Sequence, residues 1–293
     1  MVITLKTGSN IAQIDSVGAE LISLKDALGT EYIWQKDPKY WAKSSPFLFP
    51  IVGNLHNDKT IIEGKEYHIA KHGFCRTADF KVVFQSDTKA IFSYSFNEET
   101  LAQYPYKFAV SLAYELEPSQ LSIRYTVMNL DDKPIDYFLG AHPAFNVPID
   151  GNGSFEDYCL TFNKPETARC PIYDLEKSQF DTGHRVTYLD NESRLMLKYS
   201  YFDNDAIVFD TLKSDRVTLS SIKTGRGVEV QFGDFDYVAF WTPIKKDAPF
   251  LCIEPWCGMG ACSDEGDQFT EKRGVKHLEK EEQHQYTLTI IPM

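Results

Sequence analysis

LSIRYTVMN, residues 121–129, is the stretch that decides the fold, because its side chains alternate in character along the chain. In an extended strand the residues at 121, 123, 125, 127 and 129 share one face, and the residues between them share the other. The first set is mostly apolar and includes Ile123 and Val127, whereas the second includes Arg124. The stretch therefore predicts a β-strand with one face in the core.

The same alternation recurs along the chain and predicts further strands at KVVFQS (81–86), AIFSYSF (90–96), FAVSLAYEL (108–116), RVTLSSIK (216–223), GVEVQFG (227–233) and QYTLTI (285–290). Turn-forming residues separate these stretches, as in Glu117-Pro118-Ser119 and Gly151-Asn152-Gly153. The clearest helical segment is short, Asn97 to Tyr104, with Asn97 as its N-cap and Pro105 after it. No linker or repeat interrupts the strands, so we expect an all-β protein in which residues 1–293 form a single large antiparallel β-sandwich.

Composition limits the classes of partner. The chain has 293 residues, 43% of them hydrophobic, and a formal net charge of -12, with no cluster of basic residues. Nucleic acids and anionic membranes are therefore not expected as partners, because phosphate groups are bound by clustered positive charge. No apolar stretch approaches the roughly 20 residues of a membrane helix, and the first ten residues do not resemble a secretion signal. We expect a cytoplasmic protein, monomeric or homodimeric.

The six cysteines are expected to be reduced and partly buried, because disulfides are rare in that compartment. Cys252, Cys257 and Cys262 recur at intervals of five residues, which is not a zinc-binding spacing of the CxxC type. No metal site is predicted from the cysteines.

Four ionisable residues lie beside glycine, proline or aromatic residues, where strand ends and loops commonly carry function. His72 precedes Gly73 in KHGFCR, and His142 lies in the proline-stiffened LGAHPAFNVP. Asp205 precedes the apolar stretch AIVF, and Glu254 interrupts the apolar strand LCIEPW. A turn or a solvated side chain would also explain His72 and Asp205. Glu254 favours function more strongly, because a carboxylate in an apolar strand is costly unless it is paired.

These four residues are compatible with several reactions. Nucleophilic hydrolysis through a GxSxG motif is excluded, because the chain contains none. Glycoside hydrolysis with Asp205 and Glu254 as paired carboxylates stays open, as does a zinc site of His72, His142 and Glu254. A histidine acid opposite a carboxylate base suits proton transfer across a neutral substrate.

The chain resembles the aldose 1-epimerase (mutarotase) family, and most closely its LacX-like branch. The resemblance rests on the order and spacing of blocks along nearly the whole sequence: PFLFPIVGN (46–54), KHGFCR (71–76), LGAHPAFNVP (139–148), NDAIVF (204–209), AFWTP (239–243) and LCIEPW (251–256). It implies the galactose mutarotase-like supersandwich fold. It also implies a small sugar as substrate and neither a cofactor nor a metal ion.

The resemblance also implies roles for individual residues. His142 corresponds to the general acid and Glu254 to the general base of ring opening. His72 corresponds to a histidine near the ring oxygen of the sugar, Asp205 to an acceptor of sugar hydroxyl groups, and Trp241 to a wall of the pocket. For this chemistry we expect a protonated His142 and an ionised Glu254 on opposite edges of one sugar-sized cavity.

One position departs from the family pattern. Asn54 stands where relatives often carry a substrate-contacting arginine, and we retain it as a candidate binding residue. Arg76 is similar to an arginine that binds phosphate in the hexose-6-phosphate branch. Because phosphate recognition favours several donors, a free sugar is preferred over a sugar phosphate. A hexose-6-phosphate 1-epimerase and a non-catalytic carbohydrate-binding protein are the alternatives.

Overall fold

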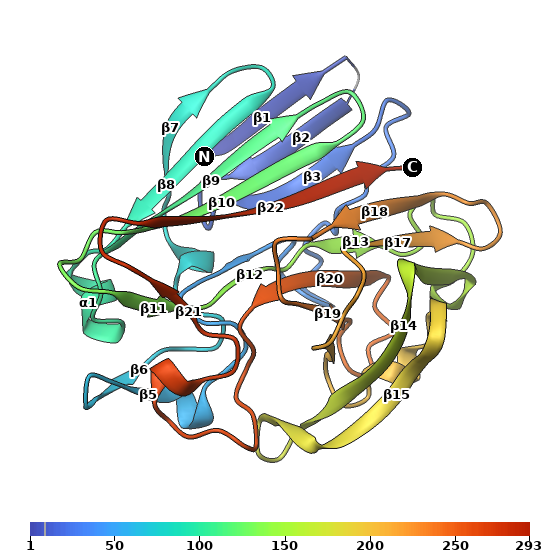
Figure 1. The fold of residues 1–293 in the computed structure, drawn as a ribbon. Coiled ribbons are helices and arrows are strands. Elements are labelled where there is room, and N and C mark those ends of the chain that lie inside the picture. Colours follow the sequence, from blue (N-terminus) through green and yellow to red (C-terminus); the bar gives the residue numbers. More distant parts are fainter. Residues whose placement is uncertain (9) are drawn as a thin grey trace.

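Strands make up nearly all the regular structure of this computed structural model, which describes residues 1–8 and 10–293 (Figure 1). The largest sheet has nine antiparallel strands, in the order β15 (Gln179–Met196), β14 (Tyr158–Asp174), β17 (Arg216–Ser221), β18 (Gly227–Gln231), β22 (Gln283–Pro292), β10 (Leu121–Asn129), β9 (Phe108–Leu116), β8 (Lys89–Ser95) and β7 (Lys81–Gln85). The strands expected from alternation all lie in this sheet.

A second antiparallel sheet lies at the centre of the molecule. Its strands follow the order β16 (Ile207–Phe209), β19 (Tyr237–Trp241), β20 (Phe250–Cys257), β12 (Leu139–Ala141) and β4 (Phe47–Leu48), and β13 (Ala144–Asn146) also pairs with β20. Phe162 of β14 stacks on Phe209 and meets Phe240 edge-on, so the two sheets pack through aromatic side chains. The β14–β15 hairpin curves away from the large sheet beside β19 and β20 (Figure 1).

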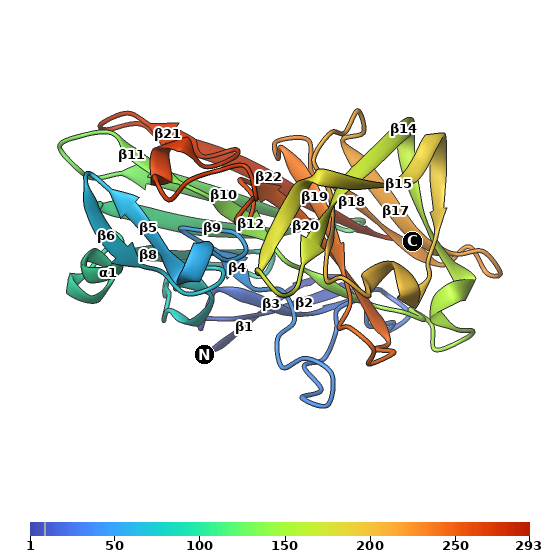
Figure 2. The same cartoon turned by 90° about the horizontal axis from the view of Figure 1, so that it is seen from below.

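Three smaller sheets complete the architecture: β1 (Val2–Thr7) with β2 (Asn10–Asp15) and β3 (Glu20–Lys25), β5 (Lys59–Ile62) with β6 (Lys65–His68), and β11 (Ile135–Tyr137) with β21 (Lys276–Leu278). The N-terminal sheet lies along one face of the β8–β10 region (Figure 2), and β1 contacts β8 and β9. The hydroxyl of Tyr114, on β9, donates a hydrogen bond of 2.6 Å to the carbonyl of Ala19 across this contact.

The observed burial explains the alternation in the sequence. In β10 the residues at 121, 123, 125, 127 and 129 are buried, whereas the residues between them are partly or fully exposed. Tyr125 lies opposite Leu112 of β9 and Tyr286 of β22, so apolar side chains meet across three adjacent strands. One continuous apolar cluster extends from Ile3 to Ile290, and the expected all-β antiparallel sandwich is confirmed.

The expected helix is also confirmed. Helix α1 spans Glu98–Gln103, and the Asn97 side chain accepts a 2.9 Å hydrogen bond from the backbone of Thr100 in a capping box. The remaining helical segments are 3₁₀ turns: η1 (His56–Asp58), η2 (Cys75–Thr77), η3 (Phe155–Asp157), η4 (Tyr199–Phe202) and η5 (Phe269–Glu271). All six cysteines are free and buried, and no helix within residues 1–8 and 10–293 is long and apolar enough to cross a membrane.

Candidate active site

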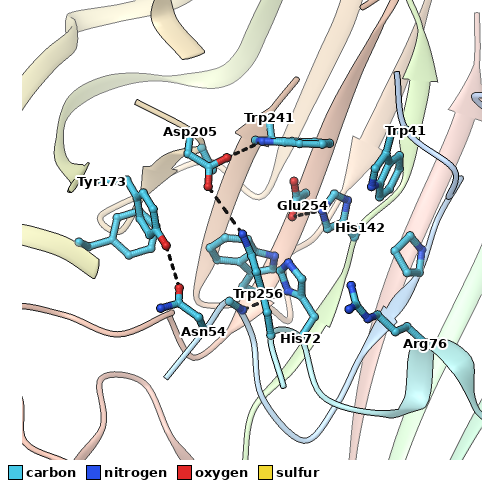
Figure 3. Close-up of a pocket in the computed structure, with 15 residues that line it drawn as sticks. Trp41, Asn54, His72, Arg76, His142, Tyr173, Asp205, Trp241, Glu254 and Trp256 are labelled. Atoms are coloured by element: carbon cyan, nitrogen blue, oxygen red, sulfur yellow. Dashed lines mark hydrogen bonds and ion pairs between the residues drawn. The ribbon is translucent and has the colours of Figure 1, made fainter. Parts of the chain in front are cut away.

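A cavity of about 270 Å³ opens beside β20, near the lower end of the size range of small-molecule sites. Its walls come from segments far apart in the sequence, and Figure 3 shows their side chains converging. The lining residues are Trp41, Pro46, Gly53, Asn54, Lys71, His72, Arg76, His142, Tyr173, Phe180, Asp205, Ala206, Trp241, Glu254 and Trp256. All seven residues predicted for the site from the sequence are among them.

His142 and Glu254 contact each other in this cavity. The imidazole Nε2 lies 3.1 Å from Glu254 Oε2, and the two residues are only 6% and 1% exposed. The His142 ring stacks on Trp41 at a centroid distance of 5.0 Å and meets Trp241 edge-on. The aromatic rings therefore fix the imidazole, and the expectation that the two groups occupy opposite edges of the cavity was wrong.

Burial opposes the charge states that we expected. It lowers the pKa of His142 to about 3, an effect increased by the nearby cations Lys71 and Arg76. Burial raises the pKa of the Glu254 carboxyl well above its usual range, and the charge of Asp205 raises it further. Burial thus favours a protonated carboxyl group beside a neutral imidazole. One proton moved over 3.1 Å would convert it to carboxylate and imidazolium.

His72 is fixed by its own backbone and by Gly53. The backbone N–H of Gly53 donates to His72 Nδ1 at 3.1 Å, and the backbone N–H of His72 donates to the Gly53 carbonyl at 2.7 Å. Burial holds the pKa of His72 well below its usual value. Because Nδ1 of this neutral ring is an acceptor, Nε2 carries the proton and is the nitrogen free to donate to a ligand.

Asp205 is an acceptor with both oxygens engaged. Its Oδ1 accepts a 2.6 Å hydrogen bond from the Trp241 indole (Figure 3). Its Oδ2 lies 3.7 Å from Lys71 Nζ. Each carboxylate oxygen has a second lone pair, so Asp205 can still accept from a hydroxyl group. Trp241 thus orients Asp205 as well as forming part of the cavity wall.

Two of these residues have an unusual backbone conformation. His72 and Asp205 have φ angles of 67° and 71°, in the left-handed region that non-glycine residues seldom occupy. Such residues concentrate at functional sites, because the surrounding structure must hold them there. Ten other non-glycine residues of the described chain, Glu281 among them, also have positive φ angles, and only His72 and Asp205 of this group line the cavity.

Asn54 lines the cavity, but its amide is engaged by neighbouring protein groups. Its Oδ1 accepts a 3.0 Å hydrogen bond from the Tyr173 hydroxyl, and its Nδ2 donates to the carbonyl groups of Leu55 and Ser178. Tyr173 and Ser178 belong to the β14–β15 hairpin and its tip, so Asn54 fastens that hairpin to the loop after β4. These hydrogen bonds give Asn54 a positioning role, and its place in the cavity wall leaves the expected binding role as a prediction.

Arg76, on η2, is a half-buried cation beside the cavity. No carboxylate lies within 4.0 Å of its guanidinium in the part of the chain that the structure describes. Burial lowers the pKa of Arg76, which indicates that its charge is incompletely solvated. Arg76 can therefore attract an anionic group on a ligand.

Sequence reasoning missed eight lining residues: Trp41, Pro46, Gly53, Lys71, Tyr173, Phe180, Ala206 and Trp256. Tyr173 and Phe180 reach the cavity because the β14–β15 hairpin bends over it, which alternation in a single strand does not predict. Trp256 could have been found, because it lies two residues after Glu254 and therefore on the same face of β20.

One group of side chains near the cavity could hold a metal ion. The ligand atoms of His142, Cys252 and Glu254 lie within 4.8 Å of one another, and all three residues are buried. This set differs from the His72, His142 and Glu254 site left open by the sequence, because Cys252 takes the place of His72.

Comparisons with known proteins agree with this geometry. The sequence profile of the aldose 1-epimerase family matches residues 1–272. Protein LacX (plasmid) of Lactococcus lactis subsp. lactis is 38% identical over 281 residues, or 94% of each chain.

The solved galactose mutarotase related enzyme of Lactobacillus acidophilus is 31% identical, with a TM-score of 0.94 over 100% of this chain and 97% of that chain. A galactose mutarotase-like protein of Lactobacillus casei is 30% identical, with a TM-score of 0.90 over 100% of both chains. The fold, the blocks of sequence and these matches establish that the chain belongs to the aldose 1-epimerase family, whose members are carbohydrate epimerases of the mutarotase type.

Proposed function

We propose that the protein interconverts the α and β anomers of a hexose by general acid–base catalysis. On sugar binding, the proton shared by the pair passes from Glu254 to His142. The Glu254 carboxylate then removes the proton of the anomeric hydroxyl group, and the His142 imidazolium donates a proton to the ring oxygen. The bond between the anomeric carbon and the ring oxygen then breaks, and an aldehyde forms at that carbon. After rotation of the aldehyde, ring closure with both proton transfers reversed gives the other anomer, and the protein recovers its original protonation state.

The direct contact of His142 with Glu254 is the observation that carries this proposal. The hydroxyl oxygen and the ring oxygen are bonded to the same anomeric carbon, so the groups that exchange protons with them must lie close together. An acid and a base at 3.1 Å can reach both oxygens of one bound sugar. The open chain needs one proton accepted and one donated, which is what the pair can provide.

The surrounding residues fit sugar recognition. His72 Nε2 can donate to a sugar oxygen, Asp205 can accept from a hydroxyl group, and Trp41 and Trp241 offer aromatic faces for C–H groups of the ring. Positioned by rigid neighbours, each proton-transfer group is expected to contribute roughly 10²- to 10⁴-fold in rate.

The decisive experiment follows anomer exchange by NMR for a panel of free hexoses, hexose 6-phosphates and alkyl glycosides. We expect faster exchange with at least one reducing sugar and no release of alcohol from the glycosides. Binding of a sugar with unchanged exchange would instead identify a carbohydrate-binding protein. Hydrolysis of a glycoside would identify a glycosidase that uses Asp205 and Glu254.

A second candidate is the same reaction on a hexose 6-phosphate, and Arg76 favours it. The guanidinium is a half-buried cation at the cavity that no described carboxylate neutralises, and Lys71 lies on the same cavity wall. Under this alternative, Arg76→Gln would raise KM for the phosphorylated hexose at least tenfold, because an ion pair to phosphate is lost. The same substitution would leave KM for the free hexose nearly unchanged. Equal KM changes for both sugars would contradict it.

A further inference from the structure

The thiol of Cys252 lies beside the proposed acid–base pair. Residues 250, 252, 254 and 256 of β20 share one face of the strand, so Cys252 and Glu254 are neighbours on the side that carries the cavity. The ligand atoms of Cys252, Glu254 and His142 lie within 4.8 Å of one another. Cys252 itself is fully buried and does not line the cavity, so it has no part in the proposed reaction.

The spacing of these groups is close to that of a metal site. In a tetrahedral zinc centre with bonds of about 2.0–2.1 Å, neighbouring nitrogen and oxygen ligands lie about 3.3 Å apart. His142 Nε2 and Glu254 Oε2 already lie 3.1 Å apart. The Cys252 sulfur, within 4.8 Å of these atoms, must approach them to about 3.6 Å, a movement of at most about 1.2 Å, to complete three corners of the tetrahedron. The fourth corner is then left for water from the cavity.

The donor set selects the kind of ion. A thiolate sulfur, an imidazole nitrogen and a carboxylate oxygen are the ligands of Zn²⁺ and of chemically similar ions such as Cd²⁺. Mg²⁺ and Ca²⁺ prefer oxygen ligands and would not be retained by a sulfur and a nitrogen.

We propose that His142, Cys252 and Glu254 form an inhibitory binding site for Zn²⁺ or a similarly thiophilic divalent ion. On binding, the thiol loses its proton and the His142–Glu254 pair loses the proton it shares, and both protons pass to solvent. The ion then occupies the lone pairs that would exchange protons with the sugar, so metal and catalysis exclude each other. The inhibition rests on the proposed function, whereas the binding does not.

Packing alone is the competing explanation of Cys252. Its side chain belongs to a small apolar cluster with Trp34, Ala144, Ala248 and Phe250, where a thiol behaves as a small hydrophobic group. Under that explanation Cys252 has no effect on metal binding, so one substitution separates the two accounts.

The test compares Cys252→Ala with the wild type and with Cys170→Ala, which removes another buried thiol, on β14. Zn²⁺ binding is measured by equilibrium dialysis at low micromolar metal, with Mg²⁺ as the negative ion, and Cd²⁺ is followed through its thiolate charge-transfer absorbance. We expect one equivalent of Zn²⁺ in the wild type and in Cys170→Ala, and loss of that equivalent and of the absorbance in Cys252→Ala. Near-ultraviolet circular dichroism verifies the fold, and Cys252→Ser replaces a variant that does not fold.

Anomer exchange provides the second readout. We expect Zn²⁺ to inhibit the wild type and Cys170→Ala, and Cys252→Ala to keep its rate with and without the ion. Zn²⁺ binding that is equal in Cys252→Ala and the wild type, or absent from the wild type, would overturn the proposal. Because dialysis needs no enzymatic activity, its result is independent of whether the proposed epimerase function holds.

Discussion

At the scale of single residues, the proton shared by His142 and Glu254 sets the pH range of the proposed reaction. Burial lowers the pKa of His142 to about 3 and raises the pKa of Glu254, so the pair keeps one proton over a wide range. The pair gains a second proton only at a pH well below the usual pKa of histidine. It loses its one proton only at a pH above the usual pKa of a carboxyl group. We predict that kcat/KM, corrected for spontaneous exchange, does not fall between pH 6.5 and about pH 5. A decline centred near pH 6.5, the ordinary pKa of histidine, would contradict this.

The same burial predicts that Glu254→Gln is more stable than the wild type at neutral pH. In the folded protein the pKa of Glu254 lies above its ordinary value of 4.5. Unfolding at pH 7 therefore releases a proton, and the free energy of unfolding falls as the pH rises above 4.5. Glutamine resembles the protonated carboxyl group but cannot ionise. We expect a higher Tm by calorimetry at pH 7, with about 2–4 °C for each kcal/mol gained, and no difference at pH 4. A lower Tm at pH 7 would count against the raised pKa.

Single residues show how far sequence reasoning reaches. His72, His142, Asp205 and Glu254 were recognisable because ionisable groups stood beside glycine, proline or apolar strand residues, and all four reach the cavity. Their charge states were not predictable, because desolvation depends on neighbours such as Trp41 that lie far away in the sequence. The hydrogen bonds of Asn54 were not predictable for the same reason, since its partner Tyr173 is 119 residues away.

At the scale of elements, the turn that carries His72 depends on a close backbone approach. Gly73 has a φ of 68°, and a Cβ at this position would lie 2.1 Å from the Phe49 carbonyl oxygen. Gly73→Ala is therefore expected to displace the turn and to destabilise the fold by more than about 1 kcal/mol. Gly64→Ala is the matched control, because Gly64 has a φ of 77° but no atom within 4 Å of an added Cβ.

Thermal unfolding of the two glycine variants measures this difference. We expect a larger fall in Tm for Gly73→Ala than for Gly64→Ala, together with slower anomer exchange only in Gly73→Ala. Equal falls in Tm would show that the left-handed backbone alone, and not the approach to Phe49, matters at position 73.

Elements with one buried face were the ones that the sequence predicted well. β9 and β10 alternate in burial along their whole length, and α1 carries its own cap. β20 has all eight residues buried, so its sequence does not alternate and gave no strand signal of period two. β20 was recognised as an apolar strand only, whereas the long β14–β15 hairpin was missed, because register shifts interrupt its pairing at several points.

At the scale of the whole molecule, we propose that residues 1–293 fold as one domain. The principal apolar cluster joins the N-terminal sheet, the nine-stranded sheet and the second sheet, from Ile3 to Ile290. Such a shared core predicts one cooperative unfolding transition, with equal calorimetric and van't Hoff enthalpies. Two resolved transitions in differential scanning calorimetry would show that the sheets unfold separately.

The overall architecture was predictable as a class, whereas its assembly was not. Recurrent alternation without a helix between strands indicates antiparallel sheets, and the resemblance of the sequence blocks indicates the family. The cavity, however, is built from the loop after β4, the β12–β13 segment, β19, β20 and the β14–β15 hairpin. Pairing between such distant segments is a property of the three-dimensional packing that no local pattern encodes.

The most direct test of the proposed chemistry is the rate of anomer exchange in Glu254→Gln. Glu229→Gln serves as the control, because it removes a carboxylate on β18 that does not line the cavity. With a sugar that the wild type converts, polarimetry or NMR should show Glu254→Gln slower by roughly 10²- to 10⁴-fold and Glu229→Gln unchanged. A folded Glu254→Gln variant that exchanges anomers as fast as the wild type would contradict the assignment of Glu254 as the base.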